Sequence, residues 1–194
     1  MRARLRDAAL PISPAEFGIE DEFALLGSFF AGPESLARFA GQVPANTDDH
    51  PLVAYRAPRI TYAPDSQPRD RLLALLAEVE VAPLEVIAQR ADETLPHRLA
   101  AYWQARNRFV QAGRAVKPSA DVWVMLAQVR EPLMSVLRVS PDFRPAYDPL
   151  LQMAAALAQT DGSAARALLG ELSAVQPARG EAAALLHELE QATP

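Results

Sequence analysis

The sequence has 194 residues, half of them hydrophobic, and a formal net charge of −5. A half-apolar chain of this length folds around a core, which excludes a disordered polyelectrolyte, and the negative charge argues against nucleic acid as a partner. The absence of cysteine excludes disulfide bonds, thiolate metal ligands and a cysteine nucleophile.

The sequence also lacks membrane and export signals. No apolar run approaches the about 20 residues that span a bilayer, and the first residues have no apolar stretch like that of a signal peptide. We therefore expect a cytoplasmic protein with no membrane contact from this chain.

The first part of the chain, residues 1–62, is predicted to contain short helices and then an extended segment. Ser13, Pro14 and Glu16 match a helix N-terminus with a capping box.

Two further short helices are predicted near residues 20–30 and 33–41. This region holds more aromatic surface than a pair of short helices can bury. We therefore predict a docking surface formed by Phe23, Phe29 and Phe30.

A turn is predicted where Asn46, Thr47 and two aspartates follow one another, because these side chains bond to nearby backbone. The alternative is a metal or acid–base site built from Asp48, Asp49 and His50. Adjacent carboxylates on a strand point to opposite faces and cannot easily share one ion, so we favour the turn.

The residues after this turn are predicted to be extended. Pro51 and Pro58 each favour extended geometry in the residue before them. Between them, the run 52–55 suits a short strand laid across an apolar surface. A proline-rich linker is expected over residues 63–68.

Everything from residue 69 to 194 is predicted to be helical, as antiparallel hairpins. Apolar residues recur at helical spacing, and Ser119 is the predicted cap of the helix that contains Leu126. The predicted helices cover 69–81, a short element from Pro83 to Ile87, a long one from Thr94, another after Ser119, and 142–159, 163–175 and 179–191.

The last part of the chain resembles tetratricopeptide (TPR) repeats. The spacing between Pro141 and Pro177 is close to the repeat period of about 34 residues. The residues that match the repeat pattern are Tyr147, Leu150, Ala165, Leu169 and Pro177. We predict a TPR-like, α-solenoid-like cap.

Two sets of arginines and one aromatic pair are candidates for ligand binding. Tyr102 and Trp103 lie on an apolar helical stripe, so we interpret them as core residues rather than a stacking platform. The arginines are interpreted as solvated faces, the alternative being a phosphate or carboxylate partner. They are Arg56, Arg59, Arg69 and Arg71, and on the aromatic helix Arg98, Arg106, Arg108 and Arg114.

No catalytic, cofactor-binding or metal-binding residue is predicted, and no cofactor. The eight glycines never occur as G-x-G, so no nucleotide-cradling loop is present, and G-x-S-x-G, H-E-x-x-H and P-loop motifs are absent.

The run from Asn46 to Arg59 resembles the closing segment of bacterial spermidine synthase-like (aminopropyltransferase) proteins, which reads N-T-D-D-x-P-x-x-E-[FY]-x-A-P-R. Ala54 departs from this pattern, since a glutamate is usual there. The residues assigned to the motif are Asn46, Thr47, Asp48, Asp49, His50, Pro51, Tyr55, Arg56, Pro58 and Arg59.

The resemblance implies a function in polyamine biosynthesis. In that family the glycine-rich loop and the catalytic aspartate precede this segment, and helical TPR-like extensions often follow it. The chain is therefore expected to be a non-catalytic C-terminal helical region that supports a catalytic domain or its assembly. Its expected partner is that missing upstream domain, or a second copy of the chain. The alternative is an independent TPR-like module that binds a protein or peptide, and a small enzyme built around Asp48, Asp49 and His50 ranks last.

Overall fold

The computed structural model describes residues 11–41, 43–65, 67–79, 83, 87 and 94–191, and all regular structure in these ranges is helical. In chain order the helices are η1 (Pro14–Phe17, a 3-10 helix), α2 (Glu22–Gly27), α3 (Pro33–Gly41), α4 (Leu52–Thr61), α5 (Pro68–Glu78), α7 (Thr94–Arg114), α8 (Val122–Val139), α9 (Arg144–Ala158), α10 (Gly162–Val175) and α11 (Gly180–Gln191). The prediction of a mainly α protein is confirmed.

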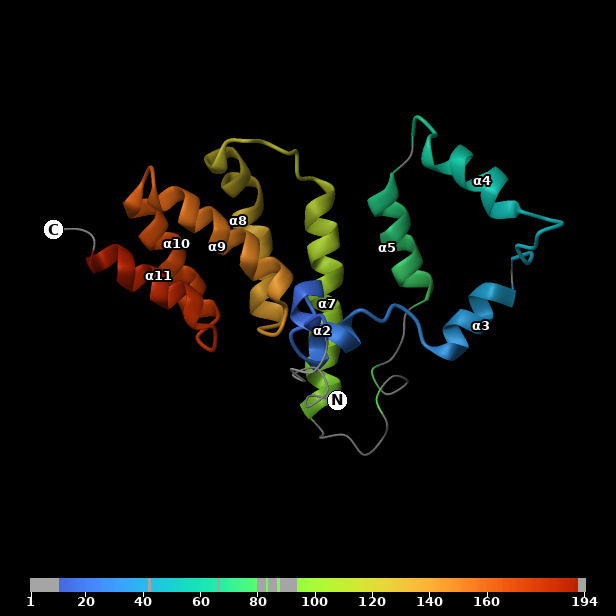
Figure 1. The fold of residues 1–194 in the computed structure, drawn as a ribbon, viewed down its shortest axis with the longest axis horizontal. Helices are drawn as coiled ribbons and strands as arrows, with labels where there is room; N and C mark the ends of the chain where they lie inside the picture. The colour runs from blue at the N-terminus through green and yellow to red at the C-terminus, as the bar shows by residue number, and fades with distance from the viewer. Residues whose placement is uncertain are drawn as a thin grey trace.

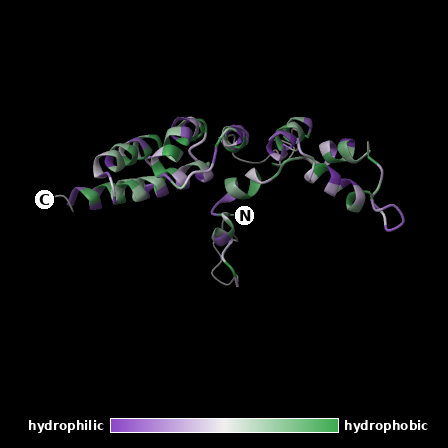
Figure 2. Ribbon diagram, turned by 90° about the horizontal axis from the view of Figure 1, so that it is seen from above, coloured by the Kyte–Doolittle hydropathy of each residue, from purple (hydrophilic) through white to green (hydrophobic). Residues whose placement is uncertain are grey.

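The helices are arranged as an arch with α7 near its centre (Figure 1). From α7 to α11, each helix packs against the next one along the chain, and these five helices are called the body. On the other side of α7 lies α5, and beyond it α3 and α4. The short helix α2 crosses α7, which it contacts. Alternate helices of the body, α8 with α10 and α9 with α11, also contact each other. Seen from above, the C-terminal part of the body accordingly forms two layers of helices (Figure 2).

Side-chain caps begin several of these helices. The predicted capping box of η1 is present, with Ser13 and Glu16 bonded reciprocally. The prediction of Ser119 as the cap of α8 is wrong. Asp121 caps that helix, accepting from the N–H groups of Trp123 at 2.8 Å and Val124 at 3.4 Å. Ser119 instead accepts from the N–H of Asp121 at 3.1 Å.

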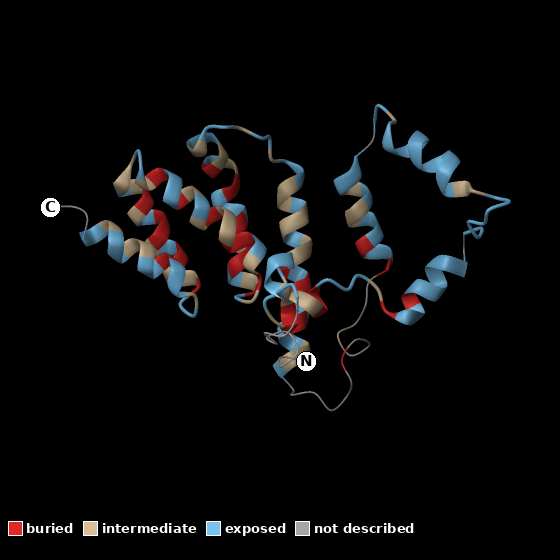
Figure 3. Cartoon of the chain, in the orientation of Figure 1, coloured by how far each residue is buried: buried red, intermediate tan, exposed pale blue. Residues whose placement is uncertain are grey.

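The core lies in the body and includes two residues of α2. Buried residues concentrate from α7 to α10, whereas α3 and α4 are almost entirely exposed (Figure 3). The largest fully buried side chains are Tyr147, Phe23, Leu99, Met134, Leu137, Leu150, Leu157, Leu168, Leu169, Leu172, Gln176 and Val136. The body therefore has a hydrophobic interior of its own.

The residues that carry the repeat pattern lie at the contact between α9 and α10. Tyr147 and Leu150 of α9 and Ala165 and Leu169 of α10 are fully buried, whereas Pro177 is exposed. The small side chain of Ala165 suits close helix packing, and the Tyr147 hydroxyl accepts from the N–H of Ala182 in α11 at 3.0 Å. These contacts form a packed hairpin; its likeness to a TPR repeat stays a prediction.

Two buried polar residues end the helices α8 and α10. Ser140 and Gln176 are the C-caps, and their N–H groups donate to the carbonyls of Val136 at 3.2 Å and Leu172 at 2.8 Å. The Gln176 amide also donates to the carbonyl of Leu137 at 3.4 Å. This bond joins the ends of α10 and α8, which explains why a polar side chain is buried there.

The prediction of an extended run at residues 52–55 is wrong, because these residues begin α4. An extended segment needs a neighbouring strand to satisfy its backbone groups, and the described residues contain none. A helix satisfies them internally, and Pro58, inside α4, removes only one N–H.

The boundaries around the predicted linker also change. Pro68 is the first residue of α5, so it belongs to that helix rather than to the linker over 63–68. α5 ends at Glu78, three residues before the predicted end. The short element predicted from Pro83 to Ile87 lies mostly outside the described residues. The division into domains 1–62 and 69–194 stays a prediction.

Candidate functional site

The Asn46 segment forms a turn that leads into α4. The N–H of Thr47 donates to the carbonyl of His50 at 3.2 Å, and the N–H of His50 donates to the backbone oxygen and side-chain oxygen of Thr47 at 3.0 and 3.1 Å. Asn46 acts as a cap, because its side-chain oxygen accepts from the N–H of Val53 at 2.9 Å. The predicted turn is confirmed, and Asn46 replaces the side-chain cap that Pro51 cannot provide.

The charged residues of this turn do not converge on a site. Asp48, Asp49 and His50 are all exposed. Within the described ranges, no group of three or more histidine or acidic side chains is placed to hold a metal ion. The motif residues thus shape the backbone locally.

Helices α3 and α4 with the turn between them form an exposed arm. Ser35 is the only buried residue of α3 and α4. Tyr55 of the motif is 70 % exposed, and Arg56, Pro58 and Arg59 are exposed as well. The exposed apolar residues of the arm and its C-terminal end are Leu36, Phe39, Val43, Val53, Tyr55, Ile60 and Tyr62.

The three predicted docking phenylalanines separate into two groups. Phe23 is only 2 % exposed, because it packs in the core beneath the guanidinium of Arg98, which lies 4.1 Å from the ring centroid. The prediction of Phe23 as a docking residue is therefore wrong. Phe29 and Phe30 are 46 % and 45 % exposed and remain at the surface.

Two arginines of α7, Arg98 and Arg114, have side chains that are about half exposed, as a solvated face requires, but both are also ion-paired. The Nε and Nη2 atoms of Arg98 donate to the two carboxylate oxygens of Asp142, at 3.1 and 2.6 Å. This pair links α7 to the residues just before α9. This hydrogen bond raises the pKa of Arg98. Arg114 pairs with Asp70 of α5 at 2.6 Å. These arginines connect helices, which the sequence interpretation missed.

Arg106 has a different environment. Its guanidinium donates to the carbonyls of Gly27, the last residue of α2, at 2.9 Å and of Phe29 at 2.7 Å. It also lies 4.7 Å from the Phe30 ring centroid. Its Nε donates to Asn107 at 3.2 Å. Burial lowers the pKa of Arg106, because no carboxylate offsets the cost of removing its charge from water.

Arg106 lines a crevice between α5 and α7. The crevice measures about 320 Å³. It is lined by Phe30, Leu73, Leu76, Pro83, Ala100, Trp103, Gln104, Arg106, Asn107, Arg108 and Gln111. One part of this lining is apolar and the other carries two arginines and three amides.

A second hollow lies between α7, α8 and α9. Its volume is about 200 Å³, and its lining is mostly apolar. Phe109, Met125, Leu133 and Met153 are among its lining residues, together with Arg69 from α5. An apolar groove with one cation can accept an apolar side chain of a partner.

Tyr102 and Trp103 are core residues, as predicted. Both are buried. The indole N–H of Trp103 donates to the carbonyl of Leu26 at 3.3 Å, and the Tyr102 ring meets Phe143 edge-on with centroids 5.1 Å apart. A Cβ on Gly27 would lie 2.0 Å from the Tyr102 ring, so only glycine lets α2 lie this close to α7.

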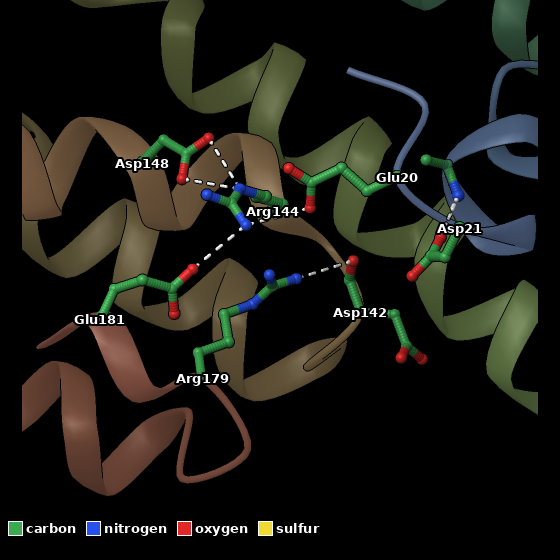
Figure 4. Close-up of polar contacts among 8 residues, drawn as sticks. Glu20, Asp21, Asp142, Arg144, Asp148, Arg179 and Glu181 are labelled. Atoms are coloured by element: carbon green, nitrogen blue, oxygen red, sulfur yellow. Dashed lines mark hydrogen bonds and ion pairs between the residues drawn. The ribbon is translucent and has the colours of Figure 1, made fainter. Parts of the chain in front are cut away.

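The sequence interpretation missed Arg144, at the first position of α9. Its guanidinium pairs with Asp148 at 3.0 Å, Glu20 at 3.0 Å and Glu181 at 3.2 Å (Figure 4). Burial disfavours its charge, but the hydrogen bond to Asp148 and the surrounding carboxylates together raise the pKa of Arg144. Only the pairing with Asp148, four residues on, follows from helical spacing; Glu20 and Glu181 come together with Arg144 through the fold.

No protein-family model, curated protein or solved structure matches this chain. In the described part of the chain, no helix combines the length and the apolar character needed to cross a bilayer. The candidate sites are an exposed apolar arm, an apolar groove and an arginine-lined crevice. Each has a geometry suited to binding another molecule.

Proposed function

We propose that this chain is the non-catalytic, helical C-terminal region of a spermidine synthase-like protein, and that its arm docks on the aminopropyltransferase-type domain. The observation that carries the proposal is the contrast between the arm and the body. The body buries its own apolar residues, whereas α4 buries none. Apolar surface of this kind is stabilised when a partner covers it.

The position of the motif supports the same proposal. The N-T-D-D-H-P turn orients α4, and α4 carries the exposed Val53, Tyr55 and Ile60. In the proposed arrangement the turn positions a hydrophobic helix against the catalytic domain, and the body extends from that contact as a scaffold. The chain then contributes to assembly and stability, and the catalytic residues belong to the partner.

Co-purification tests this proposal. The chain is produced together with an aminopropyltransferase-type domain of a spermidine synthase-like protein, and the amount of complex is measured. We expect a stable complex that Leu36→Asp and Ile60→Asp weaken at least about tenfold, because each places a charge in an apolar contact. Trp123→Asp is the matched control, since Trp123 is a similarly exposed apolar residue on α8, away from the arm.

Two results would contradict the proposal. One is a complex that the arm variants leave unchanged. The other is product formation by the isolated chain from putrescine and decarboxylated S-adenosylmethionine, because a non-catalytic region has no turnover of its own.

The groove between α7, α8 and α9 favours a second candidate function, an independent TPR-like module that binds a peptide. Its apolar lining with Arg69 at one side suits an apolar peptide that carries an acid. The co-purification experiment separates the two functions. If Arg69→Glu abolishes binding of the co-purified domain and the arm variants do not affect it, the result would favour the peptide-binding module.

A further inference from the structure

The four arginines of α7 differ in what neutralises them. Arg98 and Arg114 have carboxylate partners on other helices. Arg106 and Arg108 have none within ion-pair distance among the residues that the structure describes, and both line the crevice between α5 and α7. Two cations without acids therefore border one cavity.

Arg106 carries a charge that the protein only partly compensates. Its guanidinium contacts two backbone carbonyls, one side-chain amide and an aromatic ring, all of them uncharged. Nη1 and Nε make those hydrogen bonds, so the donors of Nη2 are available. A half-buried cation of this kind gains from an anion that approaches through the crevice.

The rest of the lining determines what kind of anion fits. Gln104, Asn107 and Gln111 add hydrogen-bonding groups beside the arginines, and the remaining wall is apolar. The apolar lining residues are Phe30, Leu73, Leu76, Pro83, Ala100 and Trp103. The crevice volume of about 320 Å³ lies at the lower end of the range for small-molecule sites. An inorganic anion would make no apolar contact with these residues.

We propose that this crevice binds a small organic carboxylate with an apolar body, its carboxylate on Arg106 and Arg108 and its apolar part against Trp103 and Phe30. The two guanidinium groups supply charge-assisted hydrogen bonds to the carboxylate. The site does not depend on the arm or on the function proposed for it, so either proposal can fail alone.

Benzoate is the probe, and the two tryptophans of the chain are the reporters. The full chain is titrated with benzoate while the indole N–H signals are followed by two-dimensional NMR, with Trp123→Phe used to assign them. We expect a saturable shift of the Trp103 signal. The Trp123 signal is the internal control, because Trp123 lies on α8 and does not line this crevice. Benzamide, which lacks the charge, and inorganic phosphate, which lacks the ring, should each bind at least about tenfold more weakly.

Arg108→Gln tests the role of the arginines. Arg108 is exposed and holds no other element in place, so this variant keeps the fold, and we expect benzoate binding to weaken about tenfold. Arg106→Gln should weaken benzoate binding further. Arg106 also bonds to the backbone at the end of α2, so if the Arg106→Gln variant does not fold, the Arg108→Gln result decides the test. Arg130→Gln, at an exposed arginine paired with Glu171, is the matched control.

The proposal is overturned if benzoate leaves the Trp103 signal unmoved, or if benzamide or phosphate shifts it with the same affinity as benzoate. It is also overturned if Arg108→Gln binds benzoate as the unmodified chain does.

Discussion

Tyr102 shows how one residue joins two helices of this protein. Its ring fills the space above Gly27 of α2 and meets Phe143 on its other side. The side chain is nearly inaccessible to solvent, and burial raises the pKa of Tyr102 to about 12. In the unfolded chain the same hydroxyl ionises near pH 10. Tyr102 therefore couples the packing of α2 on α7 to pH.

Stability should fall at high pH because of this residue. Between pH about 10 and 12 the unfolded chain loses the Tyr102 proton before the folded chain does, so the folded state binds more protons and unfolding becomes easier as pH rises. A shift of about two units corresponds to a loss of about 2.7 kcal/mol that is complete near pH 12 and absent below pH 10. Urea unfolding at pH 8, 10 and 11.5 measures it.

Tyr102→Phe is the control for this prediction, because it keeps the ring and removes the ionising group. The variant should lose less stability between pH 8 and 11.5 than the unmodified chain. A smaller pH dependence should remain, since burial also raises the pKa of Tyr147. An identical loss in both proteins would contradict the role of Tyr102.

At the scale of elements, acidic N-caps begin two of the well-packed helices, α8 and α10. Asp121 and Asp161 accept backbone N–H groups at the first turns of α8 and α10. Both helices then place an apolar face in the core. α4 differs, because its cap comes from Asn46, outside the helix, and its apolar residues remain exposed. Capping thus starts α4, but the part of the chain that the structure describes buries none of its residues.

Replacement of the α8 cap distinguishes Asp121 from Ser119. Asp121→Ala should lower the free energy of unfolding by about 1 kcal/mol, since the N–H groups of Trp123 and Val124 lose their acceptor. Ser119→Ala removes one bond outside the helix and should cost less. Urea denaturation of both variants measures the difference. An equal or greater effect at Ser119 would mean that the cap is assigned to the wrong residue.

At the scale of the whole molecule, packing decreases along the arch from the body to the arm. The body has a continuous core, α5 adds Leu76 and Val79 beside α7, and the arm buries almost nothing (Figure 3). Ion pairs join the helices along the arch, including Arg130 to Glu171 between α8 and α10. Local stability follows the density of buried apolar contacts.

Hydrogen exchange should therefore be graded along the chain. Amides of α9 and α10 are expected to exchange only through global unfolding, whereas amides of α4 should exchange orders of magnitude faster. Hydrogen–deuterium exchange read by mass spectrometry measures both regions in one experiment. The helix α10 provides the internal reference, and protection of α4 equal to that of α10 would contradict the proposed difference between arm and body.

The amino-acid sequence by itself determined most helices and much of the core. Helical spacing and caps are local signals, so the boundaries of α3, the first residue of α7 and the burial of Leu99 and Tyr102 follow from residues a few positions apart.

Only the tertiary structure decided the burial of Phe23 and the partners of the arginines. Arg106 bonds to Phe29, which is 77 residues away, and Arg144 pairs with Glu20, 124 residues away. Such contacts depend on where the folded helices lie relative to one another, and no local pattern encodes that position.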